Sequence, residues 1–321
     1  MNKKRRLSLL LALAMIAAAL CAGCGGEQAQ QKGTEAELET QPADDGVMDV
    51  LMIGNSYCYY FIEELYGIAA AAGLKMRVCS VYYDGCTMKQ HWNFLQTGAA
   101  EYRFLTCDEK GDSQIEGCTF NYCLSQGNWD VITFQPGNGP FRTMDMETIR
   151  ASVEPYLGDM LEYVREKAPQ ATYYWQQYWS PEVGNTNATY SIDAVEKRDA
   201  FYENVRTIAM EVKEKHNLPL IPTGDAWQAV RDDPVIRADG LTLCTRNRAG
   251  DPLYDDFSHD GDVGGGQYLN ACVWFEVITG RSCVGNTWRP NTYNLTEEKI
   301  ALLQQAAHAA VAGVYGEGYA Q

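Results

Sequence analysis

Two short stretches, far apart in the chain, contain the side-chain types that nucleophilic catalysis needs. Ser56 directly follows an apolar run at residues 50–53 and a break at Gly54-Asn55. Near the other end, Asp256 and His259 stand three residues apart in a loop rich in Gly and Asp. A serine hydroxyl needs a neutral imidazole to take its proton, and that imidazole needs a carboxylate to fix its tautomer. The three residues can form such a set if the fold brings the two stretches together.

The residues around Ser56 predict a strand that turns sharply into a helix. Residues 50–53 are all apolar, as in a strand buried on both faces. Apolar side chains then recur at helical spacing, at Phe61, Leu65, Ile68 and Ala72. We therefore expect Ser56 at the carboxyl end of a parallel strand, beside the free N–H groups of a helix N-terminus. The alternative is that Ser56 only caps the helix, which is a common role for serine.

Apolar runs alternate with helical patterns along the rest of the chain. Further strands are predicted over residues 75–82, 131–134, 171–176 and 218–221. Helices are predicted over residues 149–164, 201–212 and 268–278, and from a cap at Thr296 onward. Connecting segments are a loop or hairpin at residues 98–117, a polar insertion at 181–191 and a hairpin at 241–244. This alternation predicts an α/β domain over residues 47–316, with a parallel sheet covered by helices on both faces.

Residues 1–24 have the features of an export signal. Basic residues 3–6 precede an apolar stretch of residues 7–20, which is short for a membrane span. The segment before Cys24 resembles the lipobox of bacterial lipoproteins, with Cys21 in place of the usual Leu. This resemblance implies cleavage before Cys24, lipid attachment to its sulfur and a location on the outer face of the cytoplasmic membrane. Secretion without a lipid is the alternative, and residues 25–46 have the composition of a disordered tether.

Composition restricts the choice of partners. The net charge of −16 disfavours binding to nucleic acid, because the phosphate backbone would be repelled. Eleven cysteines are present, and a bridge among Cys107, Cys118 and Cys123 is possible in an oxidising compartment. The remaining cysteines beyond Cys24 mostly lie in apolar patterns that favour buried free thiols.

Several segments together resemble the SGNH (GDSL-like) hydrolase family. They are GNSYCYY at residue 54, DGCTMKQHW at 84, WDVITFQ at 129, IPTGDAW at 221 and the final D-x-x-H. The likeness covers residues 48–280, with Asn55 in place of the usual Asp. It implies a three-layer α/β/α, flavodoxin-like fold with a sheet of about five parallel strands, and ester hydrolysis through an acyl-enzyme.

The same resemblance assigns roles to individual residues. Ser56 would be the nucleophile, His259 the base and Asp256 its orienter. The backbone N–H groups of Ser56 and Gly85 would form the oxyanion hole. The third family motif, G-x-N-D, is altered here, because Asn138 comes one place early and the Asp is absent. Either Asn138 or Gln135 can supply the missing amide, and the sequence does not choose between them.

Other residues offer competing interpretations. His91 is an alternative base, although its place beside Trp92 favours a structural role. Tyr178 and Trp179 lie beyond a predicted strand end and could stack on a sugar ring, or pack in the core. Asp260-Gly261-Asp262 hints at calcium, but the rest of an EF-hand loop is missing, so we expect neither metal nor cofactor.

We therefore predict a monomeric cell-surface serine esterase that removes acetyl or similar small acyl groups from carbohydrate. The membrane would be contacted through the lipid anchor only. The altered third motif leaves open a non-catalytic lipoprotein that binds a glycan or another solute in the same cleft.

Overall fold

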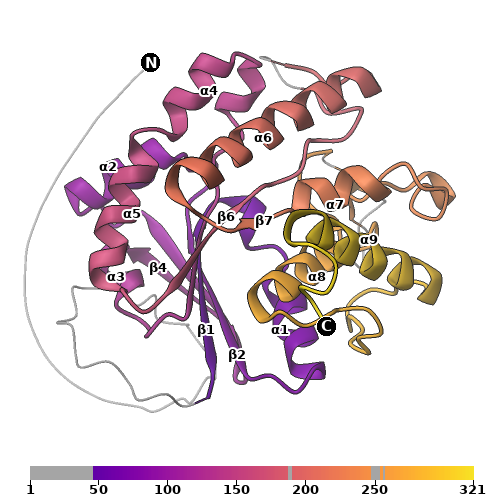
Figure 1. The fold of residues 1–321 in the computed structure, drawn as a ribbon, viewed down its shortest axis with the longest axis horizontal. Coiled ribbons are helices and arrows are strands. Elements are labelled where there is room, and N and C mark those ends of the chain that lie inside the picture. Colours follow the sequence, from indigo (N-terminus) through magenta and orange to yellow (C-terminus); the bar gives the residue numbers. More distant parts are fainter. Residues whose placement is uncertain (1–45, 187–189, 247–253, 256) are drawn as a thin grey trace, which may run out of the picture. The chain divides into compact units, whose positions relative to one another are not determined.

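Strands and helices alternate in the computed structural model, which describes residues 46–186, 190–246, 254–255 and 257–321. These residues belong to one compact unit. Within them, seven strands form one sheet in the order β4-β3-β2-β1-β5-β6-β7 (Figure 1). The strands are β1 (Met48–Gly54), β2 (Met76–Tyr82), β3 (Tyr102–Asp108), β4 (Gly111–Cys118), β5 (Val131–Phe134), β6 (Thr172–Gln176) and β7 (Leu220–Ile221).

The strands predicted from apolar runs form the parallel part of the sheet. β2, β1, β5, β6 and β7 are neighbours in that order, and each pair is parallel. This is the order of flavodoxin-like folds, in which the first strand lies inside the sheet. Residues 50–53 of β1 have no exposed surface, which explains their unbroken apolar sequence.

The remaining two strands are an addition to the predicted sheet. β3 and β4 pair antiparallel with each other, and β3 pairs antiparallel with β2. The prediction of about five parallel strands is therefore confirmed for the parallel part, and the hairpin within residues 98–118 adds two antiparallel strands to the sheet. Most of β4 is exposed, so its sequence lacks an apolar period from which a strand could be predicted.

Helices cover both faces of the sheet (Figure 1). One face is covered by α1 (Ile62–Ala71), α7 (Thr223–Val230), α8 (Gly266–Thr279) and α9 (Glu297–Tyr315). The other is covered by α2 (Met88–Thr97), α3 (Phe120–Leu124), α4 (Met146–Val153), α5 (Tyr156–Lys167) and α6 (Val195–His216). The predicted α/β fold with two helical layers is thus confirmed. Among the helices of the described residues, none is long and apolar enough to cross a membrane.

Three local predictions need correction. The helix predicted over residues 149–164 is two helices, α4 and α5, because Pro155 lacks the N–H that a continuous helix needs. Helix α7 was not predicted, since its eight residues include Gly224 and Asp225, which disfavour helix. The short hairpin is formed by β8 (Thr245–Arg246) and β9 (Tyr254–Asp255) instead of residues 241–244.

The nine cysteines among the described residues are buried, and none of them forms a disulfide with another described cysteine. Burial is the largest cause that raises the pKa of most of these thiols, and it raises the pKa of Cys58 to about 12. The bridge that the sequence allows among Cys107, Cys118 and Cys123 is not formed, although the Cys118 and Cys123 thiols are in hydrogen-bond contact.

Candidate active site

Ser56 follows the carboxyl end of β1 and is the first residue of a short 3-10 turn, η1 (Ser56–Cys58). Asn55, and not Ser56, caps this turn, because its Oδ1 accepts a hydrogen bond from the backbone N–H of Tyr57 at 3.0 Å. The capping role considered for Ser56 is therefore wrong. The regular helix α1 starts at Ile62, six residues after Ser56. The Ser56 side chain thus has no capping function and is available for another one.

His259 meets Ser56 across the carboxyl edge of the sheet. Its Nε2 lies 2.9 Å from the Ser56 Oγ, although 203 residues separate the two in the chain. The imidazole is half-buried and lies beside two aromatic rings, with centroid distances of 5.6 Å to Tyr57 and 5.2 Å to Tyr60. Asp256, the predicted orienter, lies outside the described residues. The structure thus brings together the predicted nucleophile and base.

Two backbone N–H groups at this edge have no acceptor in the described part of the chain. They belong to Ser56 and to Gly85, the two predicted oxyanion donors. Asn55 links the two segments, because its Nδ2 donates to the carbonyl of Cys86 at 3.1 Å. Unpaired N–H groups are what an oxyanion hole requires, since they must be ready to bind a developing negative charge.

The two amides proposed for the third motif have different surroundings. Gln135 is fully buried, accepts from the backbone N–H of Asn55 at 3.1 Å and donates to the carbonyl of Pro136. Its side chain also leaves no room for a side chain at residue 54, because a Cβ added to Gly54 would lie 2.6 Å from the Gln135 Oε1. Gln135 therefore holds the turn that presents Ser56. Asn138 is only half-buried, and its Nδ2 donates to the hydroxyl of Tyr57 at 2.8 Å.

A buried carboxyl group follows His259 directly. Asp260 has no exposed surface, and its Oδ2 accepts a hydrogen bond from the Asn270 Nδ2 at 3.2 Å. Its Oδ1 has no hydrogen-bond partner among the residues that the structure describes. Burial raises the pKa of Asp260 to about 7, although the nearby Arg246 and His259 side chains act in the opposite direction. This acid was named in the sequence only as part of a doubtful calcium motif, and no sequence signal marked it as buried.

The competing residues lie elsewhere. His91 is fully buried and its Nδ1 is 2.9 Å from the Tyr102 hydroxyl; burial lowers its pKa to about 3. Tyr178 and Trp179 have no exposed surface, so neither can stack on a sugar. Trp179 instead stacks on Trp227, at a centroid distance of 4.5 Å. Of the two alternatives left open by the sequence, packing in the core is therefore confirmed for both residues, and the aromatic platform is wrong.

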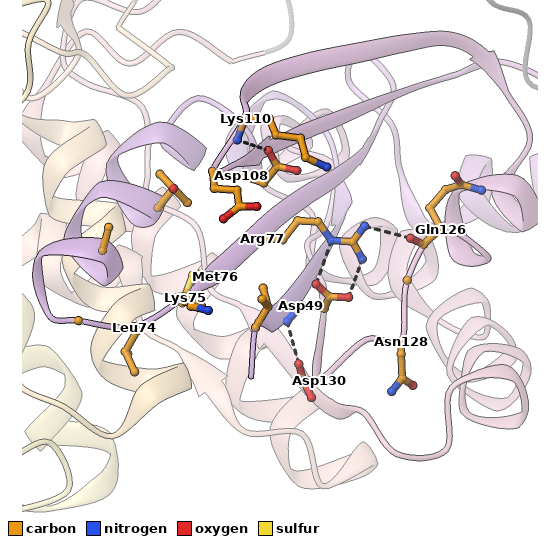
Figure 2. A pocket seen from close by; sticks show the side chains of 16 residues that line it. Asp49, Leu74, Lys75, Met76, Arg77, Asp108, Lys110, Gln126, Asn128 and Asp130 are labelled. Atoms are coloured by element: carbon orange, nitrogen blue, oxygen red, sulfur yellow. Dashed lines mark hydrogen bonds and ion pairs between the residues drawn. The ribbon is translucent and has the colours of Figure 1, made fainter. Parts of the chain in front are cut away.

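A pocket of about 630 Å³ lies at the opposite edge of the sheet, near the amino ends of β1 and β2. Figure 2 shows that its central cation, Arg77, is held by the carboxylate of Asp49 and the carbonyl of Gln126. Acidic side chains such as Asp108 and Asp130 offset the positive charge of the lysines in the lining. The lining of this pocket includes neither Ser56 nor His259, which lie at the carboxyl edge of the sheet.

Comparison with known proteins gives a family. Residues 49–310 match the family described as "Domain of unknown function (DUF4886)". The chain belongs to the DUF4886 family. The crystal structure of a DUF4886 family protein from Bacteroides uniformis has the same fold, with 22% sequence identity and a TM-score of 0.68 over 84% of this chain and 95% of that one.

Two solved enzyme structures are more distantly similar to the present chain. A lipase from a goat rumen metagenome has 11% identity and a TM-score of 0.44 over 71% of this chain and 95% of its own. A catalytic mutant of an acetylxylan esterase from Geobacillus stearothermophilus has 13% identity and a TM-score of 0.43 over 72% and 94% of the two chains. No curated protein matches the chain.

Proposed function

We propose that this DUF4886 protein is a serine esterase of the SGNH type that forms an acyl-enzyme on Ser56. The observation that supports the proposal most strongly is the 2.9 Å contact between the Ser56 Oγ and the His259 Nε2. In the first step the imidazole takes the hydroxyl proton while the oxygen attacks the ester carbonyl. The imidazolium then gives that proton to the departing alcohol, which leaves the acyl group on Ser56. Water, deprotonated by the same imidazole, attacks this acyl-enzyme and releases the acid.

The negative charge that forms on the carbonyl oxygen needs donors already in place. The proposal assigns this role to the N–H groups of Ser56 and Gly85, which have no other acceptor within the described residues. Asn138 would be the third donor, because its amide is half-buried, whereas that of Gln135 is committed to the turn before Ser56. Each such donor is typically worth about 3 kcal/mol in the transition state.

Asp256, three residues before His259 in the chain, is the third member of the proposed catalytic triad. A carboxylate three residues before the base can bind the imidazole Nδ1–H and favour the tautomer that leaves Nε2 free to accept. The imidazolium formed during attack would be stabilised by the same carboxylate.

The substrate and location belong to the proposal as well. We assign the enzyme to the outer face of the bacterial cytoplasmic membrane, anchored through a lipid on Cys24, with small acyl esters on carbohydrate as substrates. Loss of membrane-associated protein from cells that carry Cys24→Ala tests the anchor. Membrane retention of that variant, with no lipid found on residue 24 of the wild type, contradicts it.

Hydrolysis of short-chain p-nitrophenyl esters tests the chemistry, using protein that lacks residues 1–24. Ser56→Ala should lower kcat/KM by about 10⁴-fold or more, because only binding and the oxyanion donors remain. Equal rates for the variant and the wild type would refute the nucleophile assignment. Release of acetate from acetylated xylan would support a carbohydrate substrate, whereas cleavage of long-chain esters alone would indicate a lipase.

A further inference from the structure

The loop that presents His259 is fixed at the preceding residue. Ser258 is buried, and its Oγ accepts hydrogen bonds from the Asn185 Nδ2 at 2.8 Å and from the Arg142 Nη2 at 3.1 Å. Its carbonyl accepts from the Trp179 Nε1 at 2.9 Å. Three donors therefore converge on the residue next to the proposed base.

Arg142 and Asn185 also bind each other. The Arg142 Nη1 donates to the Asn185 Oδ1 at 2.8 Å, so that the two side chains and Ser258 form a closed triangle of hydrogen bonds. All three are at least nine-tenths buried. A guanidinium in such surroundings makes stronger hydrogen bonds than it would in water, because the local dielectric is low.

The donors come from two loops at the carboxyl edge of the sheet. Arg142 belongs to the 3-10 turn η2 (Pro140–Thr143), in the loop that follows β5 and contains Asn138. Asn185 belongs to the segment after β6, which the sequence presented only as a polar insertion. The triangle thus connects the loop of the proposed third oxyanion donor to the loop of the proposed base.

A buried ion cluster holds the Asn185 segment in place. Glu182 has no exposed surface, and its carboxylate lies 3.4 Å from Arg198, 3.6 Å from Arg231 and 3.1 Å from Arg237. The backbone N–H of Glu182 also donates to the carbonyl of Phe257 at 2.6 Å. The segment that orients Ser258 is therefore itself rigidly supported.

We propose that Arg142, Asn185 and Ser258 form a positioning network that keeps the His259 imidazole on the Ser56 hydroxyl. All three side chains are at least nine-tenths buried, so in this proposal each acts on the imidazole through the backbone of the loop. The network rests on the proposed esterase function, and it adds the requirement that these three side chains hold the loop of His259 in place. Displacement of a catalytic group by about 1 Å can cost about 100-fold in rate, so a loosened loop should lower the chemical step more than substrate binding.

The test compares Arg142→Ala, Arg142→Lys and Ser258→Ala in protein that lacks residues 1–24, with p-nitrophenyl acetate as substrate. Arg142→Ala and Ser258→Ala should lower kcat by 10- to 100-fold and change KM by less than about twofold. Lysine at position 142 cannot bind Asn185 and Ser258 together, so it should recover only part of the loss. Arg150→Ala is the matched control, because Arg150 forms an exposed pair with Glu211 and should leave kcat unchanged.

Guanidinium ions distinguish positioning from general damage to the fold. Low millimolar guanidinium should restore part of the kcat of Arg142→Ala at constant melting temperature and should not affect Ser258→Ala. Wild-type kcat in both alanine variants overturns the network, as does a loss explained entirely by a smaller folded fraction. A wild type without esterase activity overturns the proposed function together with the network, whereas an active wild type with unaffected variants overturns the network alone.

Discussion

Replacement of Asp260 by Asn should change how stability depends on pH. Asp260 is fully buried, and burial raises its pKa from 3.8 to about 7. The folded protein therefore keeps this proton between about pH 4 and pH 7, while the unfolded chain has already released it. Folded-state stability consequently falls as the pH rises through this window, because the folded state binds more protons than the unfolded state. A shift of about three pKa units corresponds to about 4 kcal/mol, which is the largest effect this group can have.

The Asp260→Asn variant lacks this titration but keeps an oxygen that can accept from Asn270. Relative to the wild type, its free energy of unfolding should increase by up to about 4 kcal/mol between pH 4 and pH 8. Urea denaturation at half-unit pH steps measures the difference. Glu64→Gln is the matched comparison, because burial raises the pKa of Glu64 to about 8, so its window should extend to higher pH. A difference between Asp260→Asn and wild type that stays constant across pH would refute the reasoning.

Three further predictions concern single side chains. Gly54→Ala should destabilise the protein by about 1–3 kcal/mol in urea denaturation, since the new Cβ would lie 2.6 Å from the Gln135 Oε1; an unchanged midpoint would contradict this. Asn138→Ala should lower kcat about 100-fold with little change in KM for p-nitrophenyl acetate, and an unchanged kcat would remove Asn138 from the oxyanion hole. His91→Gln should lose the contact to Tyr102 and some stability, yet keep the pH profile of kcat/KM; a shifted profile would reopen its candidacy as the base.

The fold was predictable where sequence pattern and burial coincide. The buried parallel strands, β1 above all, are continuous apolar runs, and helices such as α6 and α9 have apolar residues at helical spacing. The sequence left residues 98–117 open between a loop and the β3–β4 hairpin, because an exposed edge strand needs no apolar face. The break between α4 and α5 depends on Pro155, whose effect on a helical pattern was underestimated.

The candidate site was predictable only through residue chemistry. Ser56 and His259 could be paired because few residue types can act as nucleophile and base, and because strand ends of a parallel sheet share one edge. The sequence left Tyr178 and Trp179 between the cleft and the core, since a pattern beyond a strand end does not show whether a side chain turns inward. Arg142 and Asn185 could not be found at all, because their contacts join loops that are distant in sequence.

The most direct test of the account is covalent labelling by a fluorophosphonate, with the modified residue located by peptide mass spectrometry. With Ser56 as the nucleophile and His259 as its base, we expect a single adduct on Ser56, formed rapidly in the wild type and at least about 100-fold more slowly in His259→Ala. Labelling of a different residue, or equal labelling of Ser56 with and without the imidazole, would contradict it.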